Sequence, residues 1–386
     1  MSSLPRDTHE LRKSQFNDEM IRMTESLIQI GPNVNEISRH IKVFKETLRY
    51  RYKKLLLEEG FVISAITNYS KLGLQRFIMI AKIAPIFEPQ SAALLSAMSE
   101  LCYLHSYWQT IPDGATIMHV TVPKGLGKEC ISLYKRLKDI GLFTQLEIHG
   151  FEKVRNPPMK PEYYDFGRGT WAFDWPSPEV VINYHPFAGV SEDVEKYDMT
   201  DLLILKELDK DATRTMKQIS EIVKVSRKTI EFHYNNHVLK RGLIRGYRLY
   251  WRRARDDSSV GKIVKMPHNY VDVGVLLTGA TEAERAELAS LLNRTPFLWG
   301  EASEPDYYGE LFIPVHMYIE FLEYLKSFSQ GVAAKMRLYV LDYNRGSRFA
   351  ISYMLFDESS RKWRLDSSGI ISRFQNLILN ANSISR

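Results

Sequence analysis

The sequence is poor in cysteine and in long apolar runs, and both shortages exclude classes of protein. Only two cysteines, Cys102 and Cys130, occur among 386 residues. They are too few for a disulfide framework or a four-thiolate metal site, so we expect a protein of the reducing cytosol. No apolar run reaches the roughly 18 residues that span a bilayer, and the polar start MSSLPRDTHELRKSQ is unlike a signal peptide. We therefore expect no membrane partner.

Motifs for cofactors and metals are also scarce. The stretch PKGLGKE at 123–129 lacks the glycine spacing and the Ser/Thr of a phosphate loop, and we interpret it as a loop that leads into a helix. His233 and His237 lie four residues apart, as two metal ligands on a helix would, but no third ligand is evident. Histidines that face DNA or cap a helix are the favoured interpretation. We expect no metal, no cofactor and no catalytic residue.

One stretch occurs twice at a constant offset. Residues 36–62 and 218–244 align without a gap at an offset of 182, and eight of the 27 positions are identical. The spacing of the apolar residues predicts three helices and then a strand or hairpin in each copy. In the second copy we expect Thr200 and Ser226 to cap helices and Gly242 to end the third helix. The constant offset indicates an internal duplication.

Basic charge is concentrated in these two copies. The formal net charge is +6, but residues 39–54 alone sum to +6 and residues 217–255 to +9, so the remainder is acidic. A single basic helix is often only a solvated surface. Two such helices, each followed by a strand or wing, favour nucleic acid, because lysine and arginine neutralise phosphates and tyrosine can hydrogen-bond to them.

After each copy, the predicted elements follow the order β-α-β-β-α-β. The first set runs from residue 75 to 151 and the second from 269 to 343, with turns at Pro112 and Pro305 that match at an offset of 193. This order is typical of a ferredoxin-like split unit.

A helix-turn-helix with a wing, followed by a βαββαβ domain, resembles the leucine-responsive regulators, the Lrp/AsnC family of transcription factors. The segments EISRHIKV, ETLRYRYKKLLLEEGFV, KLGL and GLIRGY are similar to the DNA-binding half of that family. The resemblance covers about 16 to 150 and 196 to 343, twice in one chain, whereas family members usually carry one copy. Phe44 stands where Ser226 caps the second copy, and the first copy's third helix is one residue longer than usual.

The resemblance implies an α+β fold class with two winged helix-turn-helix domains, each followed by a ferredoxin-like domain. The expected parts are 10–68 and 70–152, a linker rich in proline and aromatics at 153–195, then 196–255 and 262–345, and a C-terminal extension at 346–386. We expect the linker to pack along a domain, because a disordered linker would rarely carry Trp171, Phe173 and Trp175. We also expect the C-terminal extension to dock on the body of the chain.

The resemblance implies a cytoplasmic, nucleoid-associated regulator that binds double-stranded DNA. The third helices are expected to supply Lys45, Thr47, Arg49, Tyr50, Arg51, Lys54, Arg227, Lys228, Thr229 and His233. The wing is expected to clamp phosphates through Arg245, Arg248, Arg252 and Arg253. A small-molecule effector is expected near Asp113 and Asp306, close to Trp108 and Trp299, although turn aspartates and core tryptophans are the more frequent case.

Two other functions stay open. Siroheme decarboxylases also resemble this family, and they need histidines in the βαββαβ domain. This chain offers His105 and His119 in its first copy and none in the matching strands of its second, and its basic third helices have no use in such an enzyme. The other alternative is an architectural protein that bends DNA with little regard to sequence. We favour a regulator that is not an enzyme.

The strands also carry a prediction about assembly. Apolar residues occupy both alternating sets in FIMIAKI, TIMHVTV and VDVGVLLTG, which indicates strands covered on both faces. The open faces of the two sheets therefore need cover. We expect them to meet in an intramolecular pseudo-dimer with both DNA-binding heads on one side, and a homodimer of chains is the next level expected.

Overall fold

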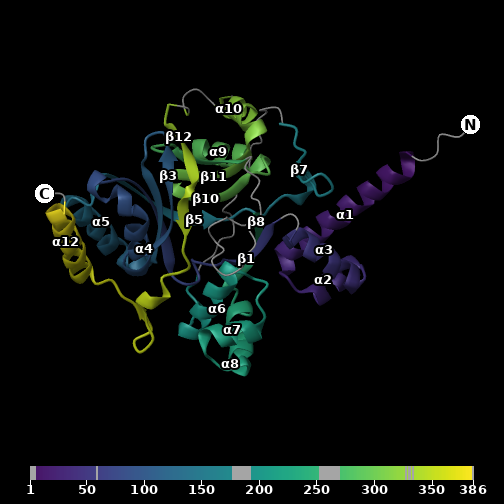
Figure 1. Ribbon diagram of the computed structural model, residues 1–386, viewed down its shortest axis with the longest axis horizontal. Helices are drawn as coiled ribbons and strands as arrows, with labels where there is room; N and C mark the ends of the chain where they lie inside the picture. Colours follow the sequence, from purple (N-terminus) through teal and green to yellow (C-terminus); the bar gives the residue numbers. More distant parts are fainter. Residues whose placement is uncertain are drawn as a thin grey trace, which may run out of the picture.

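The computed structural model describes residues 6–57, 60–175, 193–251 and 270–384, apart from 327, 329–331 and 333. Two helical heads extend from a large barrel (Figure 1). The first head consists of α1 (Arg6–Ile30), α2 (Val34–Ile41) and α3 (Lys45–Leu57), and strand β1 (Phe61–Thr67) follows it. None of the described helices has the length and apolar character needed to cross a membrane.

The second head repeats this order. It consists of α6 (Met199–Lys210), α7 (Met216–Val223), α8 (Arg227–His233), a π-helical turn η4 (Tyr234–Leu239) and strand β8 (Ile244–Trp251). Ser226 caps α8 and Gly242 has a positive φ of 65°, as the sequence predicts. The cap predicted at Thr200 is wrong, because α6 begins at Met199 and the N-cap is Asp198, whose side chain accepts the backbone N–H of Asp201.

Each half of the barrel contains four strands and two long helices. The first half has β2 (Leu74–Ile83), α4 (Ser91–Leu101), β3 (Leu104–Ile111), β4 (Thr116–Pro123), α5 (Gly127–Asp139) and β5 (Phe143–Arg155). The second half has β9 (Tyr270–Leu277), α9 (Glu282–Arg294), β10 (Leu298–Pro305), β11 (Tyr307–Pro314), α10 (Tyr318–Lys326) and β12 (Met336–Arg348). Within each half the second, third, first and fourth strands lie side by side in that order.

The two halves close into a single barrel through their fourth strands. The strand order is β10-β11-β9-β12-β3-β4-β2-β5, and β5 also pairs with β10. Both β5 and β12 are 13 residues long, which exceeds the other barrel strands. The first part of each pairs within its own half, and the last part pairs with the second strand of the other half. Each half therefore completes the hydrogen bonding of the other.

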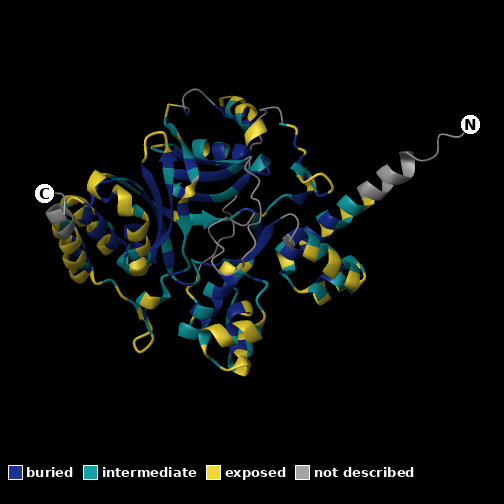
Figure 2. Ribbon diagram, viewed as in Figure 1, coloured by how far each residue is buried: buried dark blue, intermediate teal, exposed yellow. Residues whose placement is uncertain are grey.

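Three cores hold the barrel and its helices. Helices α4 and α5 cover the first half, and α9 and α10 cover the second, so buried residues gather on the barrel strands while exposed ones follow the outer helix faces (Figure 2). The barrel interior has its own cluster, which includes Ile78, Trp108, Phe151, Tyr308 and Leu341. The faces that the helices leave open thus point at one another inside the barrel.

A small hairpin follows each fourth strand. The strands β6 (Tyr164–Asp165) and β7 (Thr170–Trp171) form one, and β13 (Phe356–Asp357) and β14 (Lys362–Trp363) form the other. Trp171 donates its indole N–H to Tyr270, and Trp363 donates to Tyr197, both at 2.8 Å. The sequence analysis leaves these segments outside the repeat. The structure places matching hairpins at an offset of 192.

The segments after the hairpins pack on the body of the chain, as expected. Trp171 of the first hairpin and Phe173 after it are buried in the core that also holds the second half of the barrel, and the rings of Trp175 and Tyr324 lie tilted to each other at a centroid distance of 5.2 Å. Helix α12 (Ser367–Ile384) buries Ile370 and Phe374 in the core shared with α4 and α5. Residues 176–192 of the linker lie outside the described residues.

The strands after the two heads pair with each other. β1 and β8 form an antiparallel two-stranded ribbon in which Phe61 lies opposite Trp251 and Ala65 opposite Tyr247. Helix α1 packs on β8 and α6 packs on β1, so each head contacts the strand of the other copy. The described residues therefore show an inter-copy ribbon where the sequence predicts a separate wing for each head.

Candidate functional site

The second head presents the start of α8 to solvent. The Ser226 hydroxyl accepts the Thr229 backbone N–H at 3.1 Å, which fixes where the helix begins and uses Thr229 in the cap. Arg227 and Lys228 follow directly and are exposed. Arg227 Nε lies 2.7 Å from Glu231 Oε1, but this exposed pair is worth only about 0.3–0.5 kcal/mol. The guanidinium is therefore easily transferred to a phosphate or a base.

The first head exposes a similar set at α3. Arg49 and Tyr50 are exposed, Tyr50 to 67% of its surface, and Phe44 before the helix is 84% exposed. Lys45 and Thr47 are half-buried at the first turn. A large aromatic surface beside cations is suited to packing on sugar and phosphate. These residues lie where the sequence analysis expects contact with DNA.

Arg51 and Lys54 lie on a different face of α3. Arg51 forms an ion pair with Glu19 of α1, and both side chains are only 15% exposed. The guanidinium of Arg51 and the ammonium of Lys54 lie 5.4 and 4.7 Å from the ring centroid of Phe16. Residues three apart share a helix face, and this face meets α1. The groove-facing role expected of Arg51 is therefore corrected, since it holds α3 against α1.

His233 also faces inward. Its Nδ1 lies 2.9 Å from Asp201 Oδ1, and its side chain is 14% exposed. His237, one turn later, places its own Nδ1 3.1 Å from the same oxygen. The expectation that His233 approaches the major groove is corrected, because this part of α8 packs on α6. The structure also brings Asp198 and Asp201 to these two histidines, so the further ligands that the sequence did not reveal are present.

The expected wing arginines have different surroundings. Arg245 is exposed and donates to the Val154 carbonyl at 3.3 Å. Arg248 is buried, because β8 pairs with β1 and turns it inward, and its Nε donates to Ser64 at 3.1 Å. The phosphate-clamp role expected of Arg248 is therefore corrected. Arg252 and Arg253 lie outside the described residues.

The two heads form the same turn before their third helices. The hydroxyls of Ser38 and Ser220 donate to the carbonyls of Val43 and Val225 at 2.8 and 2.6 Å. The residues between, Lys42 and Lys224, both adopt left-handed conformations, with φ of 54° and 60°. These serines and lysines are among the positions identical between the copies. The shared residues thus produce a shared geometry.

A buried polar cluster lies inside the barrel, at the end nearer the heads. It comprises Arg76 on β2, His105 on β3, His119 on β4, Glu310 on β11 and Arg348 on β12, which line one cavity. His119 Nε2 lies 3.8 Å from Glu310 Oε2. We call this set the barrel-mouth cluster. It joins two cationic side chains, two imidazoles and one carboxylate around a cavity of about 40 Å³.

The second head and the segment before β2 reach into this cluster. Arg348 donates to Asp209 of α6 at 2.6 Å, and Asp209 is buried. The Tyr69 hydroxyl lies 3.3 Å from His105 Nε2, and its ring lies under the Arg76 guanidinium at 5.2 Å. The Arg348–Asp209 ion pair therefore joins the lining of the cavity to α6 of the second head.

Burial sets the protonation of the cluster. It lowers the pKa of His105 and His119 well below the ordinary value, and the nearby Arg76 and Arg348 lower both further. Burial also raises the pKa of the Tyr69 hydroxyl to about 12, with Asp209 adding to the rise. Neutral imidazoles can accept or donate a proton, while the two arginines favour an anionic group such as a carboxylate or phosphate.

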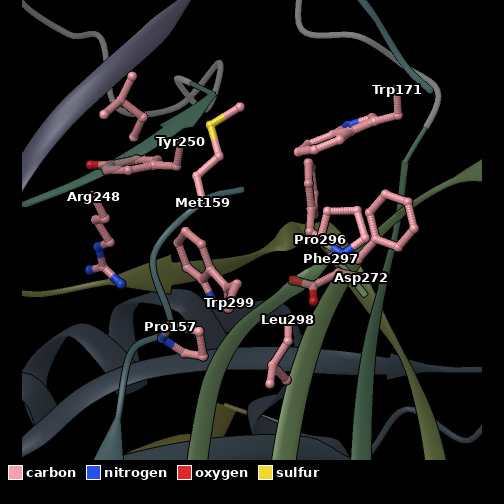
Figure 3. Close-up of a pocket in the computed structure, with 12 residues that line it drawn as sticks. Pro157, Met159, Trp171, Arg248, Tyr250, Asp272, Pro296, Phe297, Leu298 and Trp299 are labelled. Carbon is pink, nitrogen blue, oxygen red and sulfur yellow. The ribbon is translucent and has the colours of Figure 1, made fainter. Parts of the chain in front are cut away.

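A mostly apolar pocket adjoins the barrel-mouth cluster (Figure 3). Arg248 and Trp299 line both cavities. The Arg248 guanidinium lies 4.8 Å from a ring centroid of Trp299, and Met159 and Tyr250 add to the wall. Asp272 is the acid of this pocket. The pocket is suited to a flat or apolar ligand that carries a charged group.

The two turn aspartates lie at the opposite end of the barrel. Asp306 accepts the Gly279 backbone N–H at 3.1 Å and lies 2.9 Å from His149 Nδ1. Asp113 accepts the Thr110 hydroxyl and the Ala115 backbone N–H. Neither is among the residues that line the cavity of the barrel-mouth cluster or the adjoining apolar pocket, and both stabilise their own turns. The tryptophans named with them, Trp108 and Trp299, do line cavities.

The sequence analysis missed the arginines of the barrel interior. Arg76 and Arg348 carry no motif, and Arg248 was assigned to a wing. One signal is present for Arg76, which directly precedes the apolar run FIMIA in the strand LQRFIMIAKI. A charged residue on the covered face of a strand is expensive to bury, so it marks a site or an ion pair.

Comparisons with known proteins identify a DNA-binding motif in the second head. A family model described as winged helix-turn-helix DNA-binding matches residues 198–236. Among curated proteins, no sequence relative is found.

Solved structures extend the likeness to the whole chain. The crystal structure of the siroheme decarboxylase NirDL is 10% identical, covers 95% of this chain and 99% of its own, and superposes with a TM-score of 0.51. The same enzyme with an iron-uroporphyrin III analogue gives 9% identity, 97% and 100% coverage, and a TM-score of 0.52. AsnC from E. coli is 19% identical and covers 36% of this chain and 94% of its own, with a TM-score of 0.28. At these identities the whole-chain likeness establishes a shared fold. The chain thus combines a winged helix-turn-helix DNA-binding motif with the fold of NirDL.

Proposed function

We propose that this protein is a transcriptional regulator of Lrp/AsnC type that reads double-stranded DNA with two tandem helix-turn-helix heads, which share one two-stranded ribbon. The observation that carries the proposal is that both heads build the same Ser38/Ser220 turn and expose basic residues beside it. The match of residues 198–236 to a DNA-binding model supports the second head directly. We include the first head in the proposal because it forms the same turn as the second. We also propose that each head and the ferredoxin-like βαββαβ half that follows it are one copy of a duplicated unit. The two βαββαβ halves form an internal pseudo-dimer, and two chains associate as a homodimer.

Within this proposal, Arg227 and Lys228 approach the major groove from the second head, and Arg49 and Tyr50 do so from the first. Their exposure at the start or outer face of each third helix supports this role. Arg245 is exposed on the ribbon, and we assign it to a phosphate. Thr229 takes part in the cap at the start of α8, and the half-buried Lys45 and Thr47 lie at the first turn of α3.

The barrel cavities are the proposed effector site. The barrel-mouth cluster offers two arginines to an anionic group, and the pocket of Arg248 and Trp299 offers an apolar surface beside it. The Arg348–Asp209 pair links this region to α6 of the second head. An anionic small molecule that competes for Arg348 would therefore loosen or reposition that head. This location replaces the one expected at Asp113 and Asp306.

The proposal is tested by fluorescence anisotropy with DNA fragments at several salt concentrations. We expect steep salt dependence, because each neutralised phosphate contributes about −0.9 to the slope of log affinity against log salt. Lys228→Ala should make the slope shallower by about one such unit. Lys135→Ala, an exposed lysine on the barrel helix α5, is the matched control and should leave the slope unchanged. An unmodified chain that fails to bind DNA at low salt would refute the proposal.

A second function, an enzyme of siroheme decarboxylase type, is favoured by one specific observation. His105 and His119, the histidines that such an enzyme would use, lie together in the barrel-mouth cluster with Arg76 and Arg348. Titration with an iron tetrapyrrole, followed by its absorption spectrum and by release of CO₂, distinguishes the two functions. Binding with turnover that His119→Gln abolishes would establish the enzyme, whereas absence of turnover together with DNA binding would leave the regulator.

A further inference from the structure

Four potential metal ligands converge where α8 crosses the start of α6. The nitrogen and oxygen atoms of Asp198, Asp201, His233 and His237 lie within 4.8 Å of one another. Nδ1 of His233 lies 2.9 Å from Asp201 Oδ1 and 3.6 Å from Asp198 Oδ1, and Nδ1 of His237 lies 3.1 Å from Asp201 Oδ1. Around a tetrahedral Zn²⁺ with bonds of about 2.0–2.1 Å, ligand atoms lie about 3.3 Å apart. The observed separations bracket this value.

The cluster is held in place by backbone hydrogen bonds. Asp198 Oδ1 accepts the Asp201 N–H and Asp201 Oδ2 accepts the Asp198 N–H, each at 3.1 Å, so a reciprocal capping box orients both carboxylates. Asp201 Oδ1 is thereby aimed at the histidines. On the other side, α8 continues into the π-helical turn at Tyr234–Leu239, which begins directly after His233 and contains His237. Such π turns are frequent at functional sites.

Charge gives the second reason to place a cation here. Asp201 is fully buried, and the ion partners recorded for its carboxylate in the described part of the chain are His233 and His237. A buried carboxylate needs a compensating cation. At the corresponding positions of the first head, offset by 182, Glu19 is neutralised by Arg51. The second head thus replaces a permanent cation by two imidazoles, which are good ligands for borderline divalent metals.

We propose that Asp198, Asp201, His233 and His237 bind one divalent transition-metal ion of the Zn²⁺ class. The ion joins α6 to α8 and takes the structural place that Arg51 has in the first head. With four protein ligands it is a closed structural site, which leaves no position for catalysis. The site belongs to the second head alone, since the equivalents of His233 and His237 in the first head are Arg51 and Leu55.

The test uses the full-length chain, with any affinity tag removed and after treatment with a chelator. Zn²⁺ is titrated by calorimetry or by competition with a chromophoric chelator, and Co²⁺ is titrated by its visible absorption. We expect one high-affinity ion per chain, tetrahedral Co²⁺ bands that Zn²⁺ removes, and a higher midpoint of thermal unfolding with Zn²⁺. His233→Gln and His237→Gln should each weaken binding by at least about 100-fold, beyond the loss typical of outer-shell partners.

His316→Gln is the matched control, because His316 is exposed on the barrel, away from the cluster. Asp198→Asn is a second ligand variant. Asp198 is half-exposed, so this substitution leaves the buried Asp201 carboxylate in place. Circular dichroism confirms that each variant is folded. Failure of the unmodified chain to bind Zn²⁺, or equal affinity in the histidine variants and the control, would overturn the site and leave a hydrogen-bonded His–Asp cluster. None of these readouts involves DNA, so the outcome is independent of the proposed regulator function.

Discussion

Replacement of Arg348 by methionine should destabilise the connection between the barrel and the second head. Arg348 is 20% exposed and Asp209 only 6% exposed in side-chain terms, at a separation of 2.6 Å. Removal of one partner of a buried ion pair typically costs about 3–5 kcal/mol, because the remaining charge stays buried without compensation. Here we expect the lower end of that range, since Arg76 also acts on the Asp209 carboxylate.

Thermal unfolding and a double-mutant cycle measure this effect. With an unfolding entropy of about 2.1 cal/mol/K per residue, a loss of about 3 kcal/mol in a chain of 386 residues corresponds to a fall of about 4 °C in Tm if the chain unfolds as one unit. The double variant Arg348→Met with Asp209→Asn should recover at least half of that loss, because the orphaned charge is gone. Arg345→Met, on the same strand but 71% exposed, is the control and should leave Tm unchanged. Strictly additive effects of the two substitutions would refute the argument, since coupled partners deviate from additivity.

Three further results are expected. The folded state lowers the pKa of His105 and His119. The free energy of unfolding should therefore fall as the pH drops below about 6.5, because the unfolded chain binds more protons. Chemical denaturation at several pH values should show a smaller fall in this free energy for the His119→Gln variant. Burial raises the pKa of both thiols, that of Cys130 to about 12. A thiol-reactive dye at pH 8 should therefore label Cys102 and Cys130 only as fast as the chain unfolds. Rapid labelling of the native protein would contradict the structure. Ser226→Ala removes the cap of α8 and should cost about 1 kcal/mol, seen as earlier melting of the second head and weaker DNA binding.

The sequence predicts the local elements well because their signals are local. Short runs of apolar residues locate the barrel strands, and Ser226 and Gly242 mark a helix start and end that the structure confirms. The order of strands and helices follows from the same periodicities. These signals depend on neighbours within a few residues, which the sequence displays directly.

Long-range pairing could not be predicted in the same way. The apolar and aromatic residues of β1 and β8 indicate strands. They do not reveal that Ala65 lies opposite Tyr247 of the other copy. The pairing of β8 with β1 turns Arg248 inward. The prediction that Arg248 clamps phosphate from a wing was wrong because the sequence does not reveal this pairing. His233 failed for a related reason, because its partner Asp201 is 32 residues away on another helix. The buried arginines of the barrel become a site only when both halves close.

Closure of the barrel within one chain removes a constraint that any symmetric pair of subunits must obey. In a homodimer a substitution in the interior appears twice, once from each subunit. Here β4 contributes His119 while β11 contributes Glu310, and β2 contributes Arg76 while β9 contributes Asp272. The two halves of the interior can therefore diverge, as these side chains show. Because the halves differ, a ligand of the kind proposed above would bind in one orientation rather than in two equivalent ones.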